Sequence, residues 1–225
     1  MRILASALFA GVLVFSLHAE EVVKDQKPLM VERGKLIFSE EFNQPLAKGW
    51  MDGKGKWEIV DGVLRGAELA EDKHGAVKRN PVKFHDAVVQ FSFKLDGAKR
   101  ISLSLNAEKG HVCRAVIQPT GFSVNKDKSK KDATDLGAVL DTVTTTIDPG
   151  KWYTLTVEMA GKEMLAQLDG KQIAFGSHDG LDVNKANFGF TVSGSSASFK
   201  DLKIWEAQPS AAWPAIKAKL SQAKK

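Results

Sequence analysis

The clearest pattern in the chain is the alternation of apolar and polar residues that begins at Trp152. From Trp152 to Met159 every second residue is apolar, and the alternation returns from Met164 to Leu168. A period of two residues is typical of a strand with one buried face. The Asp169-Gly170 pair that follows suits a tight hairpin, because the central residues of such a turn need positive φ. The stretch predicts an antiparallel meander that needs a second sheet to cover its apolar face.

Short runs of the same kind follow one another along most of the chain. Turn residues such as Asp61-Gly62 and Asp96-Gly97 separate them, and helical periodicity is almost absent before the tail. Many short strands at regular spacing predict an all-β fold, an antiparallel sandwich or barrel of one domain. The predicted strands are Lys35–Phe42, Trp57–Val60, Val63–Arg65, Gly75–Lys78, Ala87–Leu95, Arg100–Asn106, His111–Gln118, Gly121–Asn125, Thr142–Ile147, Trp152–Met159, Glu163–Leu168, Gln172–Phe175, Asn187–Val192 and Ala197–Trp205.

The amino-terminal residues predict export. Residues 1–19 are typical of a secretory signal peptide, because Arg2 precedes an apolar run and Ala19 is a small residue at the expected cleavage site. The alternative to a cleaved signal peptide is an uncleaved membrane anchor, but the apolar run is short for a membrane span of roughly 20 residues. After removal of the signal no segment is apolar enough to be transmembrane, so we expect a periplasmic or secreted protein. Residues 20–34 predict a charged leader arm, extended or mobile, ahead of a sandwich domain at 35–207.

The excess positive charge lies in the tail, residues 208–225. Of 32 basic residues, removal of Arg2 leaves 31 against 27 acidic ones, or +4, and the tail holds four lysines and no acid. The body is close to neutral and lacks the basic stripe of a nucleic-acid-binding protein. Trp213, Ile216 and Leu220 fall at helical spacing, and Pro214 suits a first turn. We therefore expect a short basic amphipathic helix that docks on the sandwich, frays, or contacts an acidic surface.

Cys113 is the only cysteine, so the chain has no internal disulfide. It lies in an apolar strand, and we expect it to be a small core residue rather than a nucleophile, which would need a nearby base and an electropositive, partly exposed site. A domain of this length can bury a sufficient core without disulfides.

Several motifs together resemble those of a known superfamily. They are the segments FSEEFN at 38–43, WEIVDGVLRG at 57–66 and FHDAVVQFSFKL at 84–95, the hairpin from Trp152 to Gly170, and the closing strand from Phe199 to Trp205. Their order resembles the concanavalin A-like lectin/glucanase superfamily and, within it, the 3-keto-disaccharide hydrolase family, a glycosyl-hydrolase-related family. The resemblance covers about Leu36 to Glu206. It implies a jelly-roll sandwich and a saccharide ligand, with elimination from or hydrolysis of a 3-keto-glycoside as the family-level activity.

The chain departs from that family in one strand. Family members typically carry a glycine-aromatic-glutamate sequence in a central strand, whereas the corresponding strand here, Gly110–Ala115, has no acid. Glycosidase chemistry generally needs two carboxylates that flank the scissile bond. Whether the protein is an enzyme is therefore left open by its sequence.

Alternation also predicts which polar side chains share a face. If the odd-numbered residues of 87–95, 101–105 and 113–117 enter the core, the opposite face carries polar residues that match sugar hydroxyls, and arginine offers several donors in a fixed geometry. The alternative is a solvated outer face, which antiparallel sheets commonly have. The candidate saccharide-binding residues are Ser104, Asn106, His111, Arg114 and Gln118.

Among the histidines, His111 is the candidate proton carrier, because its ordinary pKa lies near neutrality. Strict alternation places it on the core side with Cys113, so a position in a groove requires the strand end to twist or fray. His74, His85 and His178 lie near turns and have no metal-like spacing.

The resemblance implies one metal site. In many concanavalin A-like folds a calcium ion ties the first strand to the last, and Glu41 and Asp201 resemble the carboxylate positions. Oxygen ligands of this kind suit Ca²⁺. A structural calcium ion is therefore an expectation, with a turn-capping role for Asp201 as the alternative, and no other cofactor is expected.

Two classes of function follow. The first is an exported jelly-roll domain that binds or processes a saccharide. The second is a non-catalytic interaction or structural domain of the cell envelope, because sugar-stacking aromatic residues are scarce on the predicted polar strands.

Overall fold

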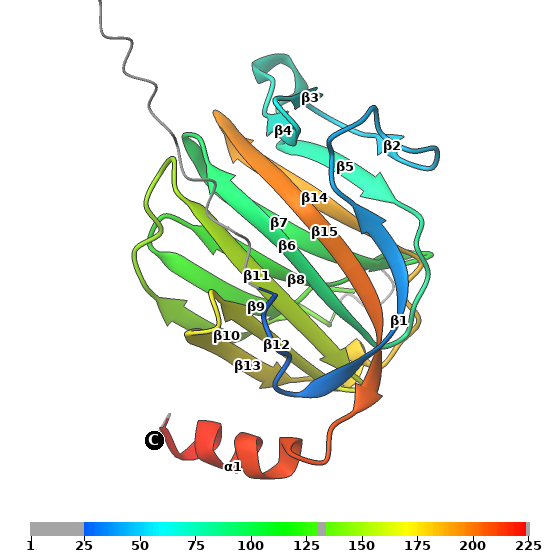
Figure 1. Ribbon diagram of the computed structural model, residues 1–225, viewed down its shortest axis with the longest axis vertical. Coiled ribbons are helices and arrows are strands. Elements are labelled where there is room, and N and C mark those ends of the chain that lie inside the picture. The colour runs from blue at the N-terminus through cyan, green and yellow to red at the C-terminus, as the bar shows by residue number, and fades with distance from the viewer. Residues whose placement is uncertain (1–24, 130–133, 224–225) are drawn as a thin grey trace, which may run out of the picture.

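The computed structural model describes residues 25–129 and 134–223. It is an antiparallel sandwich of two sheets that lie one over the other, with an α-helix at one end (Figure 1). The predicted signal peptide and residues 20–24 of the leader arm lie outside the described residues. None of the helices in the described part of the chain is long and apolar enough to cross a membrane.

Eight strands form sheet A, in the order β13-β12-β11-β6-β15-β4-β3, with β1 paired to the second half of β15. Their bounds are β1 Val31–Glu40, β3 Lys56–Val60, β4 Val63–Ala67, β6 Ala87–Leu95, β11 Trp152–Ala160, β12 Glu163–Leu168, β13 Gln172–Ser177 and β15 Ser196–Pro209.

Seven strands form sheet B, in the order β10-β9-β8-β7-β14-β5-β2. Their bounds are β2 Met51–Asp52, β5 Ala76–Asn80, β7 Ala98–Ala107, β8 Gly110–Gln118, β9 Gly121–Lys126, β10 Ala138–Thr144 and β14 Asn187–Gly194, and the remaining elements are the 3₁₀ helices η1 (Ala70–Asp72) and η2 (Asp179–Leu181) and the α-helix α1 (Trp213–Ala223).

The predicted meander is confirmed as β11, β12 and β13, consecutive neighbours at one side of sheet A. Both central residues of the β12–β13 turn have positive φ, 50° at Asp169 and 66° at Gly170, as a tight hairpin of this hand requires. The carboxylate of Asp169 accepts a hydrogen bond from the backbone N–H of Thr154 at 2.8 Å, which fixes the turn against β11.

The interior between the sheets contains the residues that alternation assigned to it. Phe91, Phe93 and Leu95 of β6 and Leu103 of β7 are fully or almost fully buried, and Cys113 of β8 lies among them. The prediction that Cys113 is a core residue is thus confirmed. Burial raises the pKa of its thiol to about 12.

One expectation about the polar face is wrong. We treated the outward residues of 87–95 and of 100–118 as one surface, but β6 lies in sheet A and β7 and β8 lie in sheet B. Gln90 and Ser92 therefore belong to the opposite side of the molecule, where they are 3% and 1% exposed. Alternation reveals that two residues share a strand face, but it does not reveal which sheet the strand joins.

The described end of the leader arm packs on the outer face of sheet A. The backbone N–H groups of Leu29, Met30 and Val31 donate to the buried carboxylate of Glu158 at 2.6–3.1 Å, and Gln167 Nε2 donates at 2.9 Å. Burial raises the pKa of Glu158, and these hydrogen bonds oppose that change because they favour the charged form. The arm between residues 25 and 31 is an ordered strap, and β1 begins at Val31, before the predicted domain boundary at 35.

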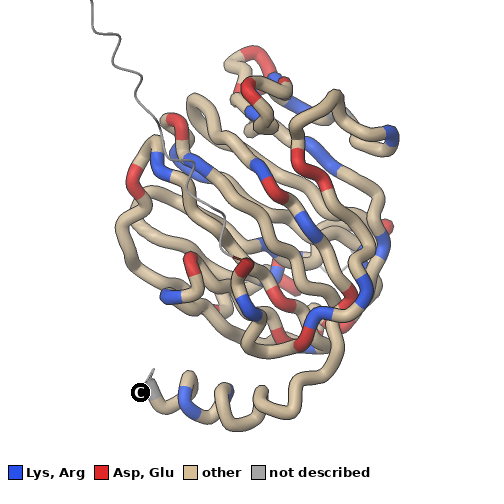
Figure 2. Tube along the Cα trace, in the orientation of Figure 1, with Lys and Arg blue, Asp and Glu red and all other residues tan. Residues whose placement is uncertain are grey.

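The tail forms the predicted helix and contacts the sandwich. Trp213 Nε1 donates to a Glu163 carboxylate oxygen at 2.8 Å, and Lys217 pairs with the same carboxylate. The Trp213 ring lies edge-on to Phe175 of β13 with centroids 5.0 Å apart. Figure 2 shows basic residues on this helix, whereas both signs of charge are interspersed over the body.

We predict that the Cys113 thiol of the folded protein does not react with a disulfide reagent at pH 8, because it is buried and its pKa is about 12. Stopped-flow labelling with Ellman's reagent should show one thiol that reacts only at the rate of unfolding. Rapid labelling in buffer, at the rate of a free thiol, would contradict the buried position.

We predict that Glu158→Gln loosens the strap. Oε2 accepts from all three backbone N–H groups, and Oε1 accepts from Leu29 and Gln167. Replacement of either oxygen by the NH₂ group of glutamine therefore leaves at least one of these donors without an acceptor. A buried polar group without a partner costs about 1–3 kcal/mol. The measurements are urea unfolding and limited proteolysis between residues 25 and 31. The control is Glu163→Gln, which removes the contacts of α1 alone and should leave this segment protected.

Candidate functional site

A row of polar residues crosses the outer face of sheet B. The strand register places Arg79 of β5 beside Gly189 of β14, Gly189 beside Ser104 of β7, Ser104 beside Arg114 of β8, and Arg114 beside Asn125 of β9. Directly paired residues share a face, and neighbouring strands lie about 4.8 Å apart. The two arginines therefore start about 14 Å from each other, with the small residues Gly189 and Ser104 between them.

Gly189 is required by the position of the Arg79 side chain. A Cβ at Gly189 would lie 2.7 Å from Arg79 Cγ and 2.8 Å from the Lys78 carbonyl oxygen. The aliphatic stem of Arg79 therefore lies over the glycine and points inward from β5 onto the outer face of the sheet.

Asn106 is the centre of a hydrogen-bond network beside this row. Its Oδ1 accepts from Ser104 Oγ at 3.0 Å and from His111 Nδ1 at 2.5 Å, and its Nδ2 donates to Asn187 Oδ1 at 2.7 Å. Because the Asn106 oxygen accepts, Nδ1 of the neutral imidazole carries the proton and Nε2 carries the lone pair. The network thus sets the His111 tautomer that can act as a base.

A β-bulge brings His111 to this network. The register of β7 and β8 shifts between Leu105, which pairs with Cys113, and Asn106, which pairs with His111. One extra residue on β8 reverses the alternation there, so His111 shares the outer face with Asn106 while Cys113 stays in the core. A position of His111 in a groove required an irregular end of its strand, and this bulge is that irregularity.

Arg114 is held in place by an ion pair. Its Nε lies 2.8 Å and 3.0 Å from the two carboxylate oxygens of Asp127, which directly follows β9. The side chains of Arg114 and Asp127 are 24% and 17% exposed, so the pair can meet a ligand. Arginine retains further N–H donors after one pairing, because its guanidinium carries five.

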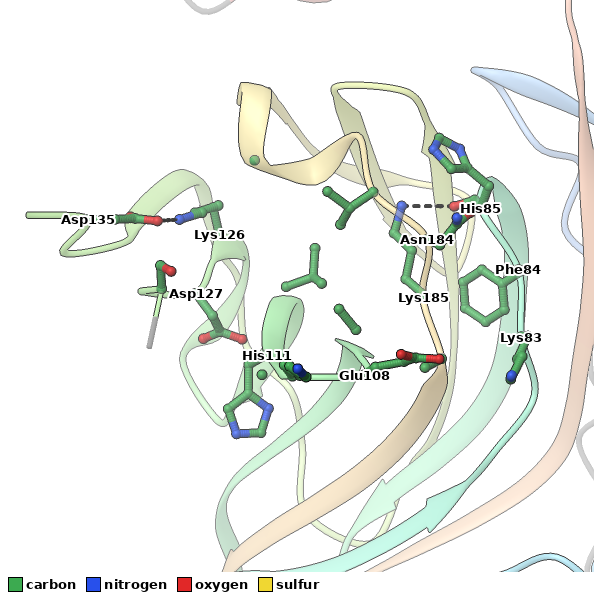
Figure 3. A pocket seen from close by; sticks show the side chains of 18 residues that line it. Lys83, Phe84, His85, Glu108, His111, Lys126, Asp127, Asp135, Asn184 and Lys185 are labelled. Carbon is green, nitrogen blue, oxygen red and sulfur yellow. Dashed lines mark hydrogen bonds and ion pairs between the residues drawn. The ribbon is translucent and has the colours of Figure 1, made fainter. Parts of the chain in front are cut away.

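A pocket of about 960 Å³ adjoins this network at the end of the sandwich. His111 and Asp127 line it together with Lys126 and Lys185, as Figure 3 shows, with Phe84 and His85 across the cavity. Lys126 forms an ion pair with Asp135 at one side. The volume of the pocket lies within the range of small-molecule sites.

Lys185 forms part of the pocket wall although it is only 1% exposed. Its Nζ donates to the carbonyl oxygens of His85 at 2.8 Å and Leu181 at 2.9 Å. Burial lowers the pKa of Lys185. The ammonium thereby ties η2 to the loop before β6 and closes one side of the pocket.

The structure brings four of the five predicted saccharide-binding residues together. Ser104, Asn106 and His111 share hydrogen bonds, and Arg114 of β8 lies directly opposite Ser104 of β7 in the strand register. Gln118 is separate, because it follows Arg114 by four residues, or about 13 Å along a strand. It lines a smaller cavity of about 160 Å³ with Ser123 and Thr142. The ligand role of all five residues stays a prediction.

The two predicted calcium ligands, Glu41 and Asp201, line one cavity of about 1030 Å³ at the outer face of sheet A. Asp201 has positive φ, 54°. The described residues contain no group of three or more side chains of the metal-binding types. Ca²⁺ takes six to eight oxygens, so these two carboxylates do not make a site unless main-chain oxygens complete it. Calcium binding stays a prediction, and we derive no function from it.

Sequence reasoning missed three participants in the site. Arg79 lies just beyond the predicted strand 75–78, and Asp127 lies in a charged segment, 126–135, between the predicted strands 121–125 and 142–147. The described ends of that segment hold the pairs Arg114–Asp127 and Lys126–Asp135. Lys185 gave no signal, because a lysine in a turn ordinarily indicates a surface position.

Solved structures show the same fold at low sequence identity. A protein of unknown function with a galectin-like fold, from Bacillus subtilis, matches with a TM-score of 0.63 at 13% identity, covering 80% of this chain and 100% of that one. The carbohydrate-binding module CBM66 from Bacillus subtilis matches with a TM-score of 0.57 at 17% identity, covering 70% and 96%. A Bacillus licheniformis β-glucanase matches with a TM-score of 0.58 at 10% identity, covering 77% and 99%. The predicted concanavalin A-like jelly roll is confirmed.

A search of curated protein sequences found no significant match. The profile of one domain family, described as 3-keto-alpha-glucoside-1,2-lyase-like, matches residues 38–205, which is most of the sandwich. This range agrees with the extent of the resemblance seen in the sequence motifs. The chain therefore belongs to the 3-keto-alpha-glucoside-1,2-lyase-like domain family.

Proposed function

We propose that the protein binds a saccharide on the outer face of sheet B, across the row from Arg79 to Arg114 and into the adjoining pocket. The observation that carries the proposal is the network of Ser104, Asn106, His111 and Arg114, which gathers donors and acceptors beside a cavity. Family membership and the folds of a carbohydrate-binding module and a glucanase support it. The signal-like residues 1–19 support a site of action outside the cytoplasm.

The arrangement suits the chemistry of sugars. A sugar hydroxyl both donates and accepts, and this face offers guanidinium donors next to amide and hydroxyl groups. The short side chains along the row let a ring approach the sheet, while the arginines contact it from either side. The two ordered pairs, Arg114–Asp127 and Asn106–His111, reduce the conformational entropy lost on binding.

We predict that Arg114→Gln weakens saccharide binding at least tenfold, about 1.4 kcal/mol, with no loss of fold. Isothermal titration against a panel of oligosaccharides measures this. The control is Arg65→Gln, which removes a guanidinium on the other sheet that donates to Ser196. Absence of binding across the panel would reject the proposal and favour the alternative, a non-catalytic interaction domain of the envelope.

A second candidate function is elimination from a 3-keto-glucoside, which the position of His111 favours. A ketone at C3 acidifies the proton at C2, so a base can remove it. The electron pair then forms the C1–C2 double bond as the C1–O bond breaks, and the leaving alkoxide takes up a proton. His111 Nε2 is the candidate base, because Asn106 holds Nδ1 as the donor.

We predict that His111→Gln abolishes turnover of a 3-keto-glucoside, since glutamine fills similar space without a basic nitrogen. Loss of the substrate and appearance of the enone absorbance measure the reaction, and titration shows whether binding persists. His74→Gln is the control, because His74 is exposed and near a turn on another part of the fold. Unchanged turnover in His111→Gln would exclude this residue as the base.

A further inference from the structure

We infer that the bound saccharide carries a carboxylate, as a uronate does, and that Arg79 holds it. This inference rests on the proposed function and adds the chemical class of the ligand. It is based on the charges that remain unpaired around the site.

Arg79 and Arg114 start from opposite ends of the same row but differ in their pairing. Arg114 is paired with Asp127, whereas the Arg79 guanidinium has no hydrogen-bond or ion-pair partner among the described residues. The stem of Arg79 is fixed over Gly189, so the charged group extends above the face from a fixed base. A partly buried arginine without a carboxylate is ready to accept one from a ligand, because its fork matches carboxylate geometry.

The pocket beside the row also has an excess of positive charge. Four lysines and three carboxylates line it, and two of those carboxylates are paired, Asp135 with Lys126 and Asp127 with Arg114. The remaining charges are Lys83, Lys109 and Lys185 against Glu108. A cavity with a net positive charge attracts ligands of the opposite sign.

Two rows of paired residues on the outer face of sheet B contain no carboxylate that would compete with a ligand for Arg79 in the described chain. The register through Arg79, Ser104 and Asn125 holds no acidic residue, nor does the next row, which runs from Val77 through Ser102 to Thr142. An acidic group on the sugar therefore meets cations at Arg79 and at the pocket, with polar neutral groups between them. A uronate oligosaccharide carries both kinds of group, carboxylates and hydroxyls.

The experiment compares sugars that differ only at C6. Maltotetraose and cellotetraose are each titrated beside the form in which every C6 hydroxymethyl is oxidised to a carboxylate, at low and at high salt. We expect the uronate of the preferred linkage to bind about tenfold more tightly at low salt, with the difference reduced at high salt. Arg79→Gln should lose this preference, because the uronate loses much more affinity than the neutral sugar does.

The matched control is Arg100→Gln, which removes the same charge from the same face at an exposed position two rows away. If it lowers uronate binding as much as Arg79→Gln does, the effect is one of net charge and the Arg79 contact is overturned. Equal affinity for both members of each sugar pair would also overturn the inference and leave the proposed function intact. If no sugar of either kind binds, the proposed function fails together with the inference.

A sulfated maltotetraose is the last ligand titrated. Because a sulfate is also an anion, preference for it over the uronate would show that the site recognises charge without the planar fork of a carboxylate, and would reject the uronate assignment. Arg79→Lys should bind the uronate less well than wild type, since lysine is a point charge and cannot pair with both oxygens in a plane.

Discussion

The structure depends on the apolar contact between its two sheets, and a stacked pair of aromatic rings lies at its centre. Phe190 of β14 and Phe199 of β15 stack with centroids 4.3 Å apart and planes at 17°, and Phe91 of β6 lies edge-on to Phe190 at 5.0 Å. β14 and β15 are consecutive in the chain yet belong to different sheets. The turn between them, with Gly194 at φ 95°, lets the chain cross from one layer to the other. This contact fixes which residues of each strand face outward.

With the inner faces committed to the core, the two outer faces differ. Sheet A is covered in part by the strap at residues 25–31, held by the buried carboxylate of Glu158, and α1 packs against β12 and β13. Sheet B presents the row from Arg79 to Asn125. A polar sheet face can be covered by its own chain, as that of sheet A is in part, or left open, and we propose that the face of sheet B binds a ligand.

The fold was largely predictable because strand alternation is a local property. The ends of the strands 87–95 and 163–168 were predicted correctly, and the Asp61-Gly62 and Asp169-Gly170 turns have the positive φ that tight hairpins need. The site was less predictable, because it depends on register. Ser104, Asn106 and Arg114 could be assigned to a face from their own strands, whereas Arg79 joins them only because β14 lies between β5 and β7.

The sequence by itself determined the class of the fold, its turns, the buried cysteine and the polar character of β7 and β8, since each follows from residues close together in the chain. Only the tertiary structure decided that β6 lies in the other sheet and that a bulge moves His111 to Asn106. It also decided that Asp127 pairs with Arg114, while Arg79 has no such partner among residues 25–129 and 134–223. The physical reason is that strand pairing joins residues far apart in sequence. One added residue in a strand reverses the face of each side chain beyond it.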